Sequence, residues 1–342
     1  MIRVLIVDDS VTQREILKRL VDGDGAFTVV AEARNGREAI AKVLEHSPDV
    51  VLMDIHMPDM DGIEATREIM RRCPVPIVVA SSTLRKQDVD LALQALEAGA
   101  ISVISKPEGA VLLNLQKIGP HLRDELIAAA KATFPRRSAA TSHQQFKQSP
   151  TLTQHIKSVD IIGVCASTGG PPVLMQIFSE LPKPVSLPVL LVQHISQGFE
   201  EGFARWLSKT TGQSVRLVTS GQKLEPGIWM APNDTHLTVS SPSRIELLPR
   251  AAKDIHCPSG NPLFASLAKQ FGAKAAGVLL TGMGDDGARG LLTLKQAGGT
   301  TIIQDEASCL IWGMPKSGKQ LGAATHELNP EGIVAALKQA LK

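Results

Sequence analysis

The sequence predicts an α/β protein made of two doubly wound, parallel-sheet domains joined by a linker. Short apolar segments alternate with amphipathic segments of helical period in residues 1–121, and the same alternation returns in residues 159–342. Between them, residues 122–158 are rich in Ser, Thr, Gln and Pro and have few large apolar side chains. A chain of 342 residues is also long enough for two hydrophobic cores.

Five strand–helix units are expected in the first region. The strand candidates are RVLIV, FTVVAEA, DVVLMD, PIVVAS and ISVIS, at residues 3–7, 27–33, 49–54, 76–81 and 101–105. Each is followed by a segment with apolar residues at helical spacing, the last of them at residues 110–119. Because crossovers between parallel strands are right-handed, these units predict one sheet with helices on both faces.

The alternation is interrupted in the middle of the chain and then resumes. Residues 121–132 still have a helical pattern, whereas residues 134–154 predict a flexible linker. Residues 227–249 predict a β-hairpin, with a turn near Ser241 and Pro242. The buried-strand candidates of the second region are VDIIGV, LPVLLVQH, AGVLLTGMG and TTIIQ, at residues 159–164, 187–194, 276–284 and 300–304.

Composition and charge argue against several classes of function. The formal charge is +2, which gives no basis for a nucleic-acid-binding surface. The four cysteines are widely scattered without a C-x-x-C pair, so neither a zinc site nor a disulfide framework is indicated. The apolar run at the N-terminus is too short for a signal peptide, and no run approaches the roughly 18 residues of a membrane span. We therefore expect a cytoplasmic protein without direct membrane insertion.

An acidic cluster is expected at the strand ends of the first region. Those ends carry, in order, Asp8 and Asp9, Asp54, Ser81 and Ser82, and Lys106. Because the carboxyl ends of parallel strands meet at one edge of a sheet, these side chains are expected to converge. Carboxylate oxygens in such a cleft suit Mg²⁺, and a metal there would neutralise a phosphoryl group arriving on a carboxylate. The structural alternative is that Asp8 and Asp9 cap the first helix and Lys106 forms an ion pair.

The same region resembles a response-regulator receiver domain. The resemblance is carried by VLIVDDS, DVVLMDIHMPDMDG, PIVVASS and SKP, and it covers about 120 residues. It implies a flavodoxin-like fold, a histidine kinase as phosphodonor and Asp54 as the phosphoacceptor. It also implies that Asp9 and Asp54 bind Mg²⁺ together with the backbone carbonyl of His56, with Asp8 in support.

Three further positions of this resemblance concern the response to phosphorylation. Ser81 matches the switch hydroxyl, and Lys106 matches the lysine that precedes a proline. The position three residues before Lys106 usually carries an aromatic residue in receiver domains, but here it is Val103. Phosphorylation is still expected, whereas Val103 has no aromatic ring whose rotamer could report it.

The strand ends of the second region supply a nucleophile, a base and a carboxylate. Ser167 follows the first strand within GVCASTGGPP, His194 follows LPVLLVQ, and Asp285 and Asp286 follow GVLLTGMG. Acyl transfer needs these three roles, and main-chain N–H groups near Ser167 or in the TGMG turn would supply an oxyanion hole. The chain order differs from that of α/β-hydrolases, and CASTG lacks the first glycine of G-x-S-x-G.

Each of these residues also has another interpretation. Ser167 would serve equally as a helix N-cap, and its glycines as a phosphate cradle, although no P-loop lysine or G-x-G-x-x-G spacing accompanies them. His236 and His256 are rival bases by residue type. Cys165 is a rival nucleophile, although its place before the turn favours a buried strand-end residue.

A second resemblance ranks these interpretations. The segments GVCASTGGPP, LVQHISQGF, MAPNDTHL, LLTGMGDDGARG and QDEASCLIWGMPK resemble the catalytic domain of chemotaxis protein-glutamate methylesterases, the CheB family. Together with the receiver-like region and the linker, the resemblance covers the whole chain. It implies a Rossmann-like catalytic domain in which Ser167 is the nucleophile, His194 the base and Asp286 the residue that orients His194. Thr168 and Met283 match positions near the nucleophile and the oxyanion hole.

Two positions depart from the family pattern. Asp285 stands where relatives often have asparagine, and a second carboxylate there is expected to raise the pKa of one of the two acids or to alter the His194–Asp286 pair. Cys257 stands where relatives commonly have arginine, which concerns substrate or interdomain contacts rather than the triad.

The resemblance implies a phosphorylation-regulated esterase that acts in bacterial chemotaxis adaptation. Its substrates would be γ-glutamyl methyl esters on the cytoplasmic helices of chemoreceptors, and the same chemistry would deamidate receptor glutamines. No cofactor is expected in the esterase site. Two alternatives remain open: a phosphorylation-dependent scaffold with a degenerate triad, and an esterase for a different methylated receptor system.

Overall fold

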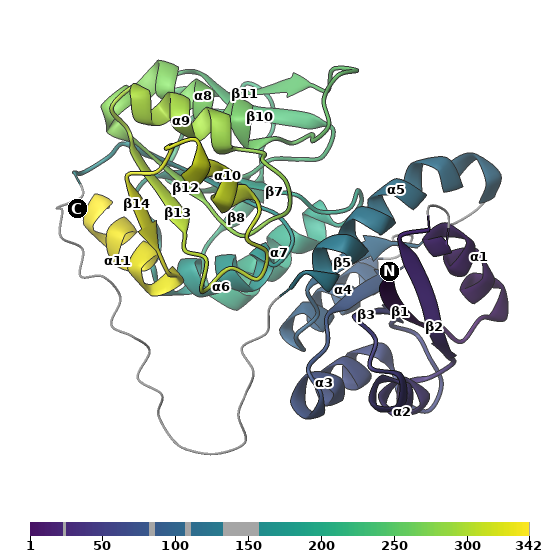
Figure 1. Cartoon of the computed structure of the whole chain (residues 1–342). Helices are drawn as coiled ribbons and strands as arrows, with labels where there is room; N and C mark the ends of the chain where they lie inside the picture. Colours follow the sequence, from purple (N-terminus) through teal and green to yellow (C-terminus); the bar gives the residue numbers. More distant parts are fainter. Residues whose placement is uncertain (23–24, 82–85, 107–110, 133–156, 342) are drawn as a thin grey trace, which may run out of the picture. The chain divides into compact units, whose positions relative to one another are not determined.

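The computed structural model of the chain contains two compact units. Figure 1 colours the chain from purple at the N-terminus to yellow at the C-terminus. The first comprises Met1–Phe134 with Ile195–Phe203, and the second comprises Pro135–His194 with Ala204–Lys342. The structure describes residues 1–22, 25–81, 86–106, 111–132 and 157–341. Ser82 and most of the predicted linker lie outside the described residues, and the domain boundaries at residues 121 and 158 stay predictions.

The first unit contains a five-stranded parallel sheet in the order β2-β1-β3-β4-β5. Its strands are β1 (Ile2–Val7), β2 (Phe27–Ala33), β3 (Val50–Asp54), β4 (Ile77–Ser81) and β5 (Ser102–Ser105). Its helices are α1 (Val11–Val21), α2 (Gly36–His46), α3 (Gly62–Arg72), α4 (Lys86–Glu97) and α5 (Val111–Ala130). The five predicted strand–helix units are therefore confirmed, and the strand order is that of flavodoxin-like folds.

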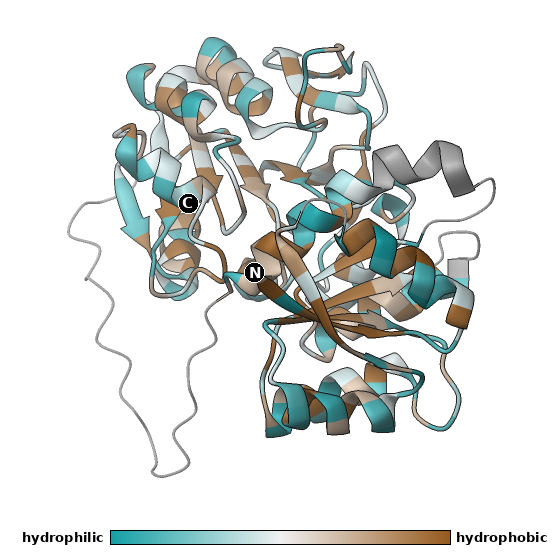
Figure 2. Cartoon of the chain, turned by 45° about the vertical axis from the view of Figure 1, so that its right-hand side comes forward, coloured by the Kyte–Doolittle hydropathy of each residue, from teal (hydrophilic) through white to brown (hydrophobic). Residues whose placement is uncertain are grey.

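The central strands of this sheet are apolar because helices cover both of their faces. All five residues of β3 and of β4 are buried, and Figure 2 draws the strands of the sheet largely in brown. The helices instead alternate brown and teal, as expected where one side packs on the sheet and the other meets water.

The second unit contains a seven-stranded parallel sheet in the order β14-β13-β12-β6-β7-β9-β8. The strands are β6 (Ile161–Ala166), β7 (Pro188–Gln193), β8 (Val215–Leu217), β9 (Gly227–Met230), β12 (Ala275–Leu279), β13 (Thr300–Gln304) and β14 (His326–Leu328). The helices are α6 (Gly170–Glu180), α8 (Gly260–Phe271), α9 (Ala288–Gln296), α10 (Met314–Gln320) and α11 (Pro330–Ala340), with a 3₁₀ turn, η2, at Gly272–Lys274. Helix α7 (Glu200–Thr211) begins in the segment assigned to the first unit and continues in the second from Ala204.

The predicted hairpin is shorter than the sequence suggested. Only β10 (Thr235–Ser241) and β11 (Arg244–Pro249) form an antiparallel pair, and the predicted turn lies between them. The first part of the predicted hairpin segment is instead β9, which pairs in parallel with β7 and β8. Trp229 and Met230 of β9 are 7% and 0% exposed. Burial of these side chains in the core favours the place of β9 in the main sheet.

The strand orders place two crevices at carboxyl strand ends. In the first sheet β2 is added on one side of β1 and β3 on the other, so the strand order reverses between β1 and β3. In the second sheet the order reverses at β6, which has β7 on one side and β12 on the other. Ligands of open α/β sheets bind at such points, because the following loops diverge there. Within the described part of the chain, no helix is both long enough and apolar enough to span a membrane.

Candidate functional site

Ser167 lies in the turn between β6 and α6, at the crevice of the second sheet. Its N–H donates to the carbonyl of Thr281 at 3.0 Å, and its own carbonyl accepts from the N–H of Gly170 at 2.8 Å. A Cβ at Gly282 would lie 2.6 Å from Cβ of Ser167, so a glycine is required where the turn after β12 passes the serine. These contacts fix the backbone of Ser167 between two strands and leave its side chain at the carboxyl edge.

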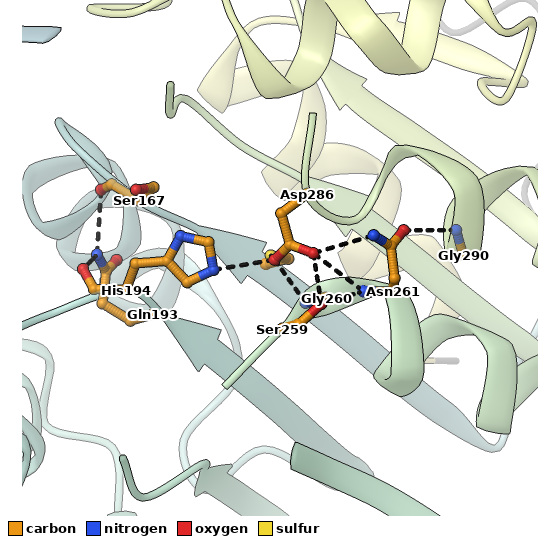
Figure 3. Close-up of polar contacts among 9 residues, drawn as sticks. Ser167, Gln193, His194, Ser259, Gly260, Asn261, Asp286 and Gly290 are labelled. Atoms are coloured by element: carbon orange, nitrogen blue, oxygen red, sulfur yellow. Dashed lines mark hydrogen bonds and ion pairs between the residues drawn. The ribbon is translucent and has the colours of Figure 1, made fainter. Parts of the chain in front are cut away.

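His194 directly follows β7, the strand that pairs with β6 before Ser167. Ala166 of β6 pairs in register with Gln193 of β7, and the N–H of His194 donates to the carbonyl of Ala166 at 3.0 Å. Ser167 and His194 each come one residue later, so their backbones begin about one inter-strand spacing apart, about 5 Å. The amide of Gln193, which is 2% exposed, donates to the carbonyl of Ser167 at 3.0 Å and to that of His194 at 2.8 Å. This double hydrogen bond, drawn in Figure 3, ties the two residues together.

Asp286 completes the constellation from the loop after β12. Its Oδ2 atom lies 2.9 Å from Nε2 of His194, and the carboxyl is 3% exposed. Burial raises the pKa of Asp286, but hydrogen bonds from His194, Ser259 and Gly260 outweigh it and hold this pKa below its ordinary value. An ionised carboxylate only accepts hydrogen bonds, so Nε2 of His194 carries a proton and Nδ1 is the nitrogen that remains as a base.

The hydroxyl of Ser167 is not yet engaged with this base. Among the described residues, no hydrogen bond joins Oγ of Ser167 to either ring nitrogen of His194. In sites without substrate such bonds are often long and tighten when substrate binds.

The two neighbouring residues named by the sequence also lie at this edge. Thr168 is 4% exposed, and its carbonyl accepts from the hydroxyl of Thr281 at 3.1 Å. Met283 is half-buried in the turn after β12, where the chain runs beside Gly313. The turns that carry both residues therefore border Ser167, as an oxyanion-binding role requires.

Of the rival nucleophile and bases, Cys165 and His256 adjoin His194 and Asp286, whereas His236 is paired with Asp254. Cys165 is fully buried, and burial together with the charge of Asp286 raises the pKa of its thiol well above the ordinary value, which disfavours the reactive thiolate. His236 pairs through Nε2 with Oδ2 of Asp254 at 2.9 Å, away from Asp286. His256 is exposed and stacks on the ring of His194, with centroids 4.8 Å apart and an interplanar angle of 7°.

The two departures from the family pattern lie outside the triad hydrogen bonds. Asp285 is exposed, and the pKa of Asp286 is lowered rather than raised, with hydrogen bonds from His194 and Ser259 among the causes. Cys257 is half-buried, and burial raises the pKa of its thiol to about 11. Asp285 faces solvent whereas Asp286 faces donors, so the pKa of Asp286 is not the one that is raised. The expected effect of Asp285 on the His194–Asp286 pair stays a prediction.

The acidic cluster of the first unit converges as the strand ends predict. Carboxylate oxygens of Asp8, Asp9 and Asp54 all lie within 4.8 Å of one another. Nζ of Lys106 lies 2.7 Å from Asp8 Oδ2 and 2.7 Å from Asp54 Oδ1. The N-cap of α1 is Ser10, whose N–H donates to Oδ1 of Asp8 at 2.9 Å, so neither Asp8 nor Asp9 is itself the N-cap. The ion pair of Lys106 in the structural alternative is present.

Burial and charge oppose each other in this cluster. Burial raises the pKa of Asp54, and the lysine only partly offsets it. Burial lowers the pKa of Lys106, but Asp54 and Asp8 outweigh it and the net shift is upward. Three carboxylates with one exposed member, Asp9, are a donor set that fits Mg²⁺, whose preferred ligands are carboxylate, carbonyl and water oxygens.

The remaining receiver residues lie next to this cluster. Ser81 is 1% exposed, and its hydroxyl donates to the carbonyl of Asp88 in α4 at 3.3 Å. The ring of His56 pairs through Nε2 with Oδ1 of Asp88 at 3.0 Å. Val103 is a buried β5 residue, 6% exposed, as expected for an aliphatic side chain at this position.

Sequence reasoning missed three residues of the second site. Gln193 joins Ser167 to His194, and Ser259 and Asn261 both donate to Asp286. A weak signal existed for Ser259, because Ser before a helix that begins Gly-Asn-Pro is an N-cap pattern. No pattern marks Gln193 or Asn261, since their roles depend on contacts between distant segments.

Two family models match the chain. The model described as "CheB methylesterase" matches residues 162–337, and the model described as "Response regulator receiver domain" matches residues 4–115. The two matches together cover both regions in which strand–helix alternation occurs.

Relatives along the full length are also found. A "Protein-glutamate methylesterase/protein-glutamine glutaminase 4" of Geobacter metallireducens is 41% identical over 343 residues, covering 98% of each chain. A "Protein-glutamate methylesterase/protein-glutamine glutaminase" of Pyrococcus horikoshii is 36% identical and covers 98% of this chain and 94% of the relative. The crystal structure of the Thermotoga maritima CheB methylesterase catalytic domain is 32% identical with a TM-score of 0.51, covering 53% of this chain and 98% of that domain.

Proposed function

The chain belongs to the CheB methylesterase family and carries a receiver domain, and from this premise we propose that it hydrolyses glutamate γ-methyl esters on chemoreceptors. We propose that it also deamidates receptor glutamines, the second activity in the names of its relatives. The observation that carries the proposal is the 2.9 Å contact between His194 Nε2 and Asp286 Oδ2. Ser167 and His194 directly follow the paired residues Ala166 and Gln193.

Ester hydrolysis follows from the roles of these three residues. Nδ1 of His194 takes the hydroxyl proton of Ser167 as Oγ attacks the ester carbonyl. The oxyanion that forms is stabilised by main-chain N–H groups of the turns that carry Thr168 and Met283. The proton on Nδ1 then goes to the departing methoxide, methanol leaves, and water hydrolyses the acyl-enzyme by the same base. With a glutamine substrate the leaving group is ammonia and the other steps are unchanged.

Asp286 stabilises the charged form of His194 during both steps. The imidazolium that forms when Nδ1 is protonated lies against a buried carboxylate that is held ionised by several donors. Because that carboxylate is fixed before the reaction, little reorganisation accompanies the charge development.

The receiver domain supplies the regulation in this proposal. Asp54 accepts a phosphoryl group from a histidine kinase. Asp9, Asp54 and the backbone carbonyl of His56 would hold Mg²⁺, with Asp8 in support, and the ion would neutralise phosphoryl oxygens. Lys106, which already contacts Asp8 and Asp54, would balance the added charge.

Phosphorylation is proposed to raise the esterase activity by shifting a conformational equilibrium. A shift of this kind needs only a few kcal/mol of differential stability between two states. Ser81, buried beside the start of α4, is the hydroxyl proposed to respond to the phosphoryl group. Because the proposed substrate glutamates lie on cytoplasmic chemoreceptor helices, the proposal also places the enzyme in the cytoplasm.

Methanol release from a methylated receptor tests the proposal. The native chain is expected to release methanol, and a small phosphodonor is expected to accelerate it. Ser167→Ala should abolish release while Asp54 still becomes phosphorylated, and Asp54→Asn should retain basal release but lose the stimulation. Unchanged release by Ser167→Ala would refute the nucleophile, and stimulation of Asp54→Asn would refute the regulation.

A further inference from the structure

The carboxylate of Asp286 receives most of its hydrogen bonds from the beginning of a single helix. Two donors lie elsewhere: the ring of His194, and the thiol of Cys165, whose Sγ is 3.9 Å from Oδ2. The others come from three consecutive residues at the start of α8. They are Ser259 Oγ, Asn261 N at 3.4 Å and Asn261 Nδ2 at 3.1 Å, all to Oδ1, and Gly260 N at 2.8 Å to Oδ2. A carboxylate that is 3% exposed requires such partners, since burying an unpaired charge is costly.

Ser259 makes two of the bonds that organise this helix end. It is the N-cap of α8, and its Oγ accepts from the N–H of Asn261 at 3.2 Å. The same hydroxyl donates its proton to Oδ1 of Asp286. A hydroxyl has one proton and two lone pairs, so both bonds form together. The helix N-terminus adds a positive dipole end, which favours the ionised form of Asp286.

Asn261 connects Asp286 to the helix that follows it. Its Nδ2 donates to Asp286, and its Oδ1 accepts from the N–H of Gly290 in the first turn of α9 at 2.8 Å (Figure 3). Only this orientation of the amide places a donor against the carboxylate and an acceptor against the N–H. A Cβ at Gly290 would lie 2.8 Å from Cα of Asn261, so the start of α8 packs directly on α9. Asn261 therefore holds both the carboxylate and the segment that carries it.

From these contacts we propose that Ser259 and Asn261 are positioning residues, which hold the ionised Asp286 carboxylate against Nε2 of His194. With Nε2–H held by this acceptor, Nδ1 is the nitrogen available to take the Ser167 proton. If the carboxylate turned or became protonated, the ring would also adopt the tautomer with its proton on Nδ1, and that tautomer is not a base toward Ser167. The reaction itself rests on the proposed function, whereas the tautomer of His194 does not depend on the substrate.

Two substitutions of Asn261 separate a positioning role from simple packing. Asn261→Asp keeps the size and the acceptor for Gly290, and an acid is favourable at a helix N-terminus, but it replaces the donor to Asp286 by a second carboxylate. Asn261→Ala removes both bonds. A positioning role predicts that the aspartate variant is the worse enzyme, by about 100-fold in kcat against about 10-fold for alanine, with KM nearly unchanged. A packing role predicts the opposite order.

Ser259 provides a second, independent pair of variants. Ser259→Ala removes the donor to Asp286 and is expected to lower kcat about 10-fold. Ser259→Thr retains a hydroxyl and the N-cap, and it is expected to restore most of kcat. This pair keeps the proposal testable if the Asn261 variants fold poorly.

The decisive readout is the tautomer of His194 in the full-length protein, observed by ¹⁵N NMR of the imidazole nitrogens at a pH where the ring is neutral. The native chain is expected to carry the proton on Nε2, and Asn261→Asp and Ser259→Ala are expected to show a mixture. Native tautomers in both variants, or losses of kcat that merely follow the losses of melting temperature, would overturn the proposal. Absence of methanol release by the native chain would instead contradict the proposed function and leave the NMR comparison valid.

Discussion

The Nε2 atom of His194 lies 2.9 Å from Oδ2 of Asp286. Nδ1 is therefore the ring nitrogen left to accept the Ser167 proton in the proposed reaction. In the familiar serine-protease arrangement the two ring nitrogens have the opposite assignment, with Nδ1 toward the aspartate. The chemistry is the same in both cases, because each nitrogen of a neutral imidazole is a donor in one tautomer and an acceptor in the other. The strand register puts the backbone of His194 beside that of Ser167. Nε2, the ring nitrogen farther from the backbone, is the one that contacts Asp286.

Replacing the carboxylate of Asp286 by an amide is expected to trap the wrong tautomer of His194. In Asp286→Asn, the side-chain NH₂ would donate to Nε2 and force the proton onto Nδ1. We expect kcat to fall about 10³- to 10⁴-fold at neutral pH. Asp285→Asn is the matched control, because Asp285 is the adjacent acid and is exposed, and its kcat should stay close to the native value. Equal losses in the two variants would show that overall charge, rather than the His194 contact, is what matters.

Gln193 is expected to affect catalysis through the backbones of two residues of the proposed triad, Ser167 and His194. Gln193→Leu leaves the carbonyls of Ser167 and His194 without the shared amide donor, and we expect kcat to fall about 10- to 100-fold. A loss of about 1–3 kcal/mol in the free energy of unfolding should accompany it, since buried carbonyls are left unpaired.

The control for this prediction is a second buried glutamine of the same unit. Gln213 is 4% exposed, and its amide donates to three backbone carbonyls, those of Phe178, Leu181 and Pro182. Gln213→Leu should destabilise the fold to a similar degree while the folded fraction keeps its kcat. If kcat and stability fall together in both variants, Gln193 has only a structural role.

Asp54 is expected to lower the stability of the first unit at neutral pH. Its pKa is raised by burial, so the folded chain binds the proton more tightly than the unfolded chain does. That contribution to stability is complete below the unfolded pKa of about 3.9 and is lost as the pH rises through the folded pKa. Asp54→Asn should therefore stabilise this unit at pH 7, and the gain should shrink as the pH falls toward the unfolded pKa.

Hydrogen exchange of the β1 and β3 amides measures this effect in the first unit alone. Lys106 keeps its contact with Asp8 in the Asp54→Asn variant, so no buried charge is left without a partner. Asp124→Asn, at an exposed position of α5, serves as the control and should change little. A loss of protection in Asp54→Asn at pH 7 would mean that the Lys106–Asp54 attraction exceeds the cost of burial.

Alkylating reagents are expected to leave the esterase activity intact near neutral pH. Burial raises the pKa of the thiols of Cys73, Cys165, Cys257 and Cys309. Since the thiolate is the reactive form, iodoacetamide at pH 7.5 should cause little loss of methanol release over an hour. Rapid inactivation that substrate prevents, together with modification of Cys165, would identify a thiol at the reaction centre and contradict the serine assignment.

The sequence alone determined where the strands are and which chemical groups stand at their ends. Apolar runs of four to six residues separated by amphipathic segments are a local property of the chain, so the β1–β5 units and the strands before Ser167, His194 and Asp286 were predictable. The convergence of Asp8, Asp54 and their neighbours also followed, since parallel strands bring their carboxyl ends to one edge.

Only the tertiary structure decided which strand pairs with which and how the buried polar groups are satisfied. The segment with Trp229 reads locally as half of a hairpin, and its place beside β7 depends on the core that forms around it. The links from Gln193 to Ser167 and from Asn261 to Asp286 and Gly290 join residues far apart in sequence. A buried hydrogen bond depends on distance and direction between two backbones, and neither is encoded in residue type or spacing along the chain.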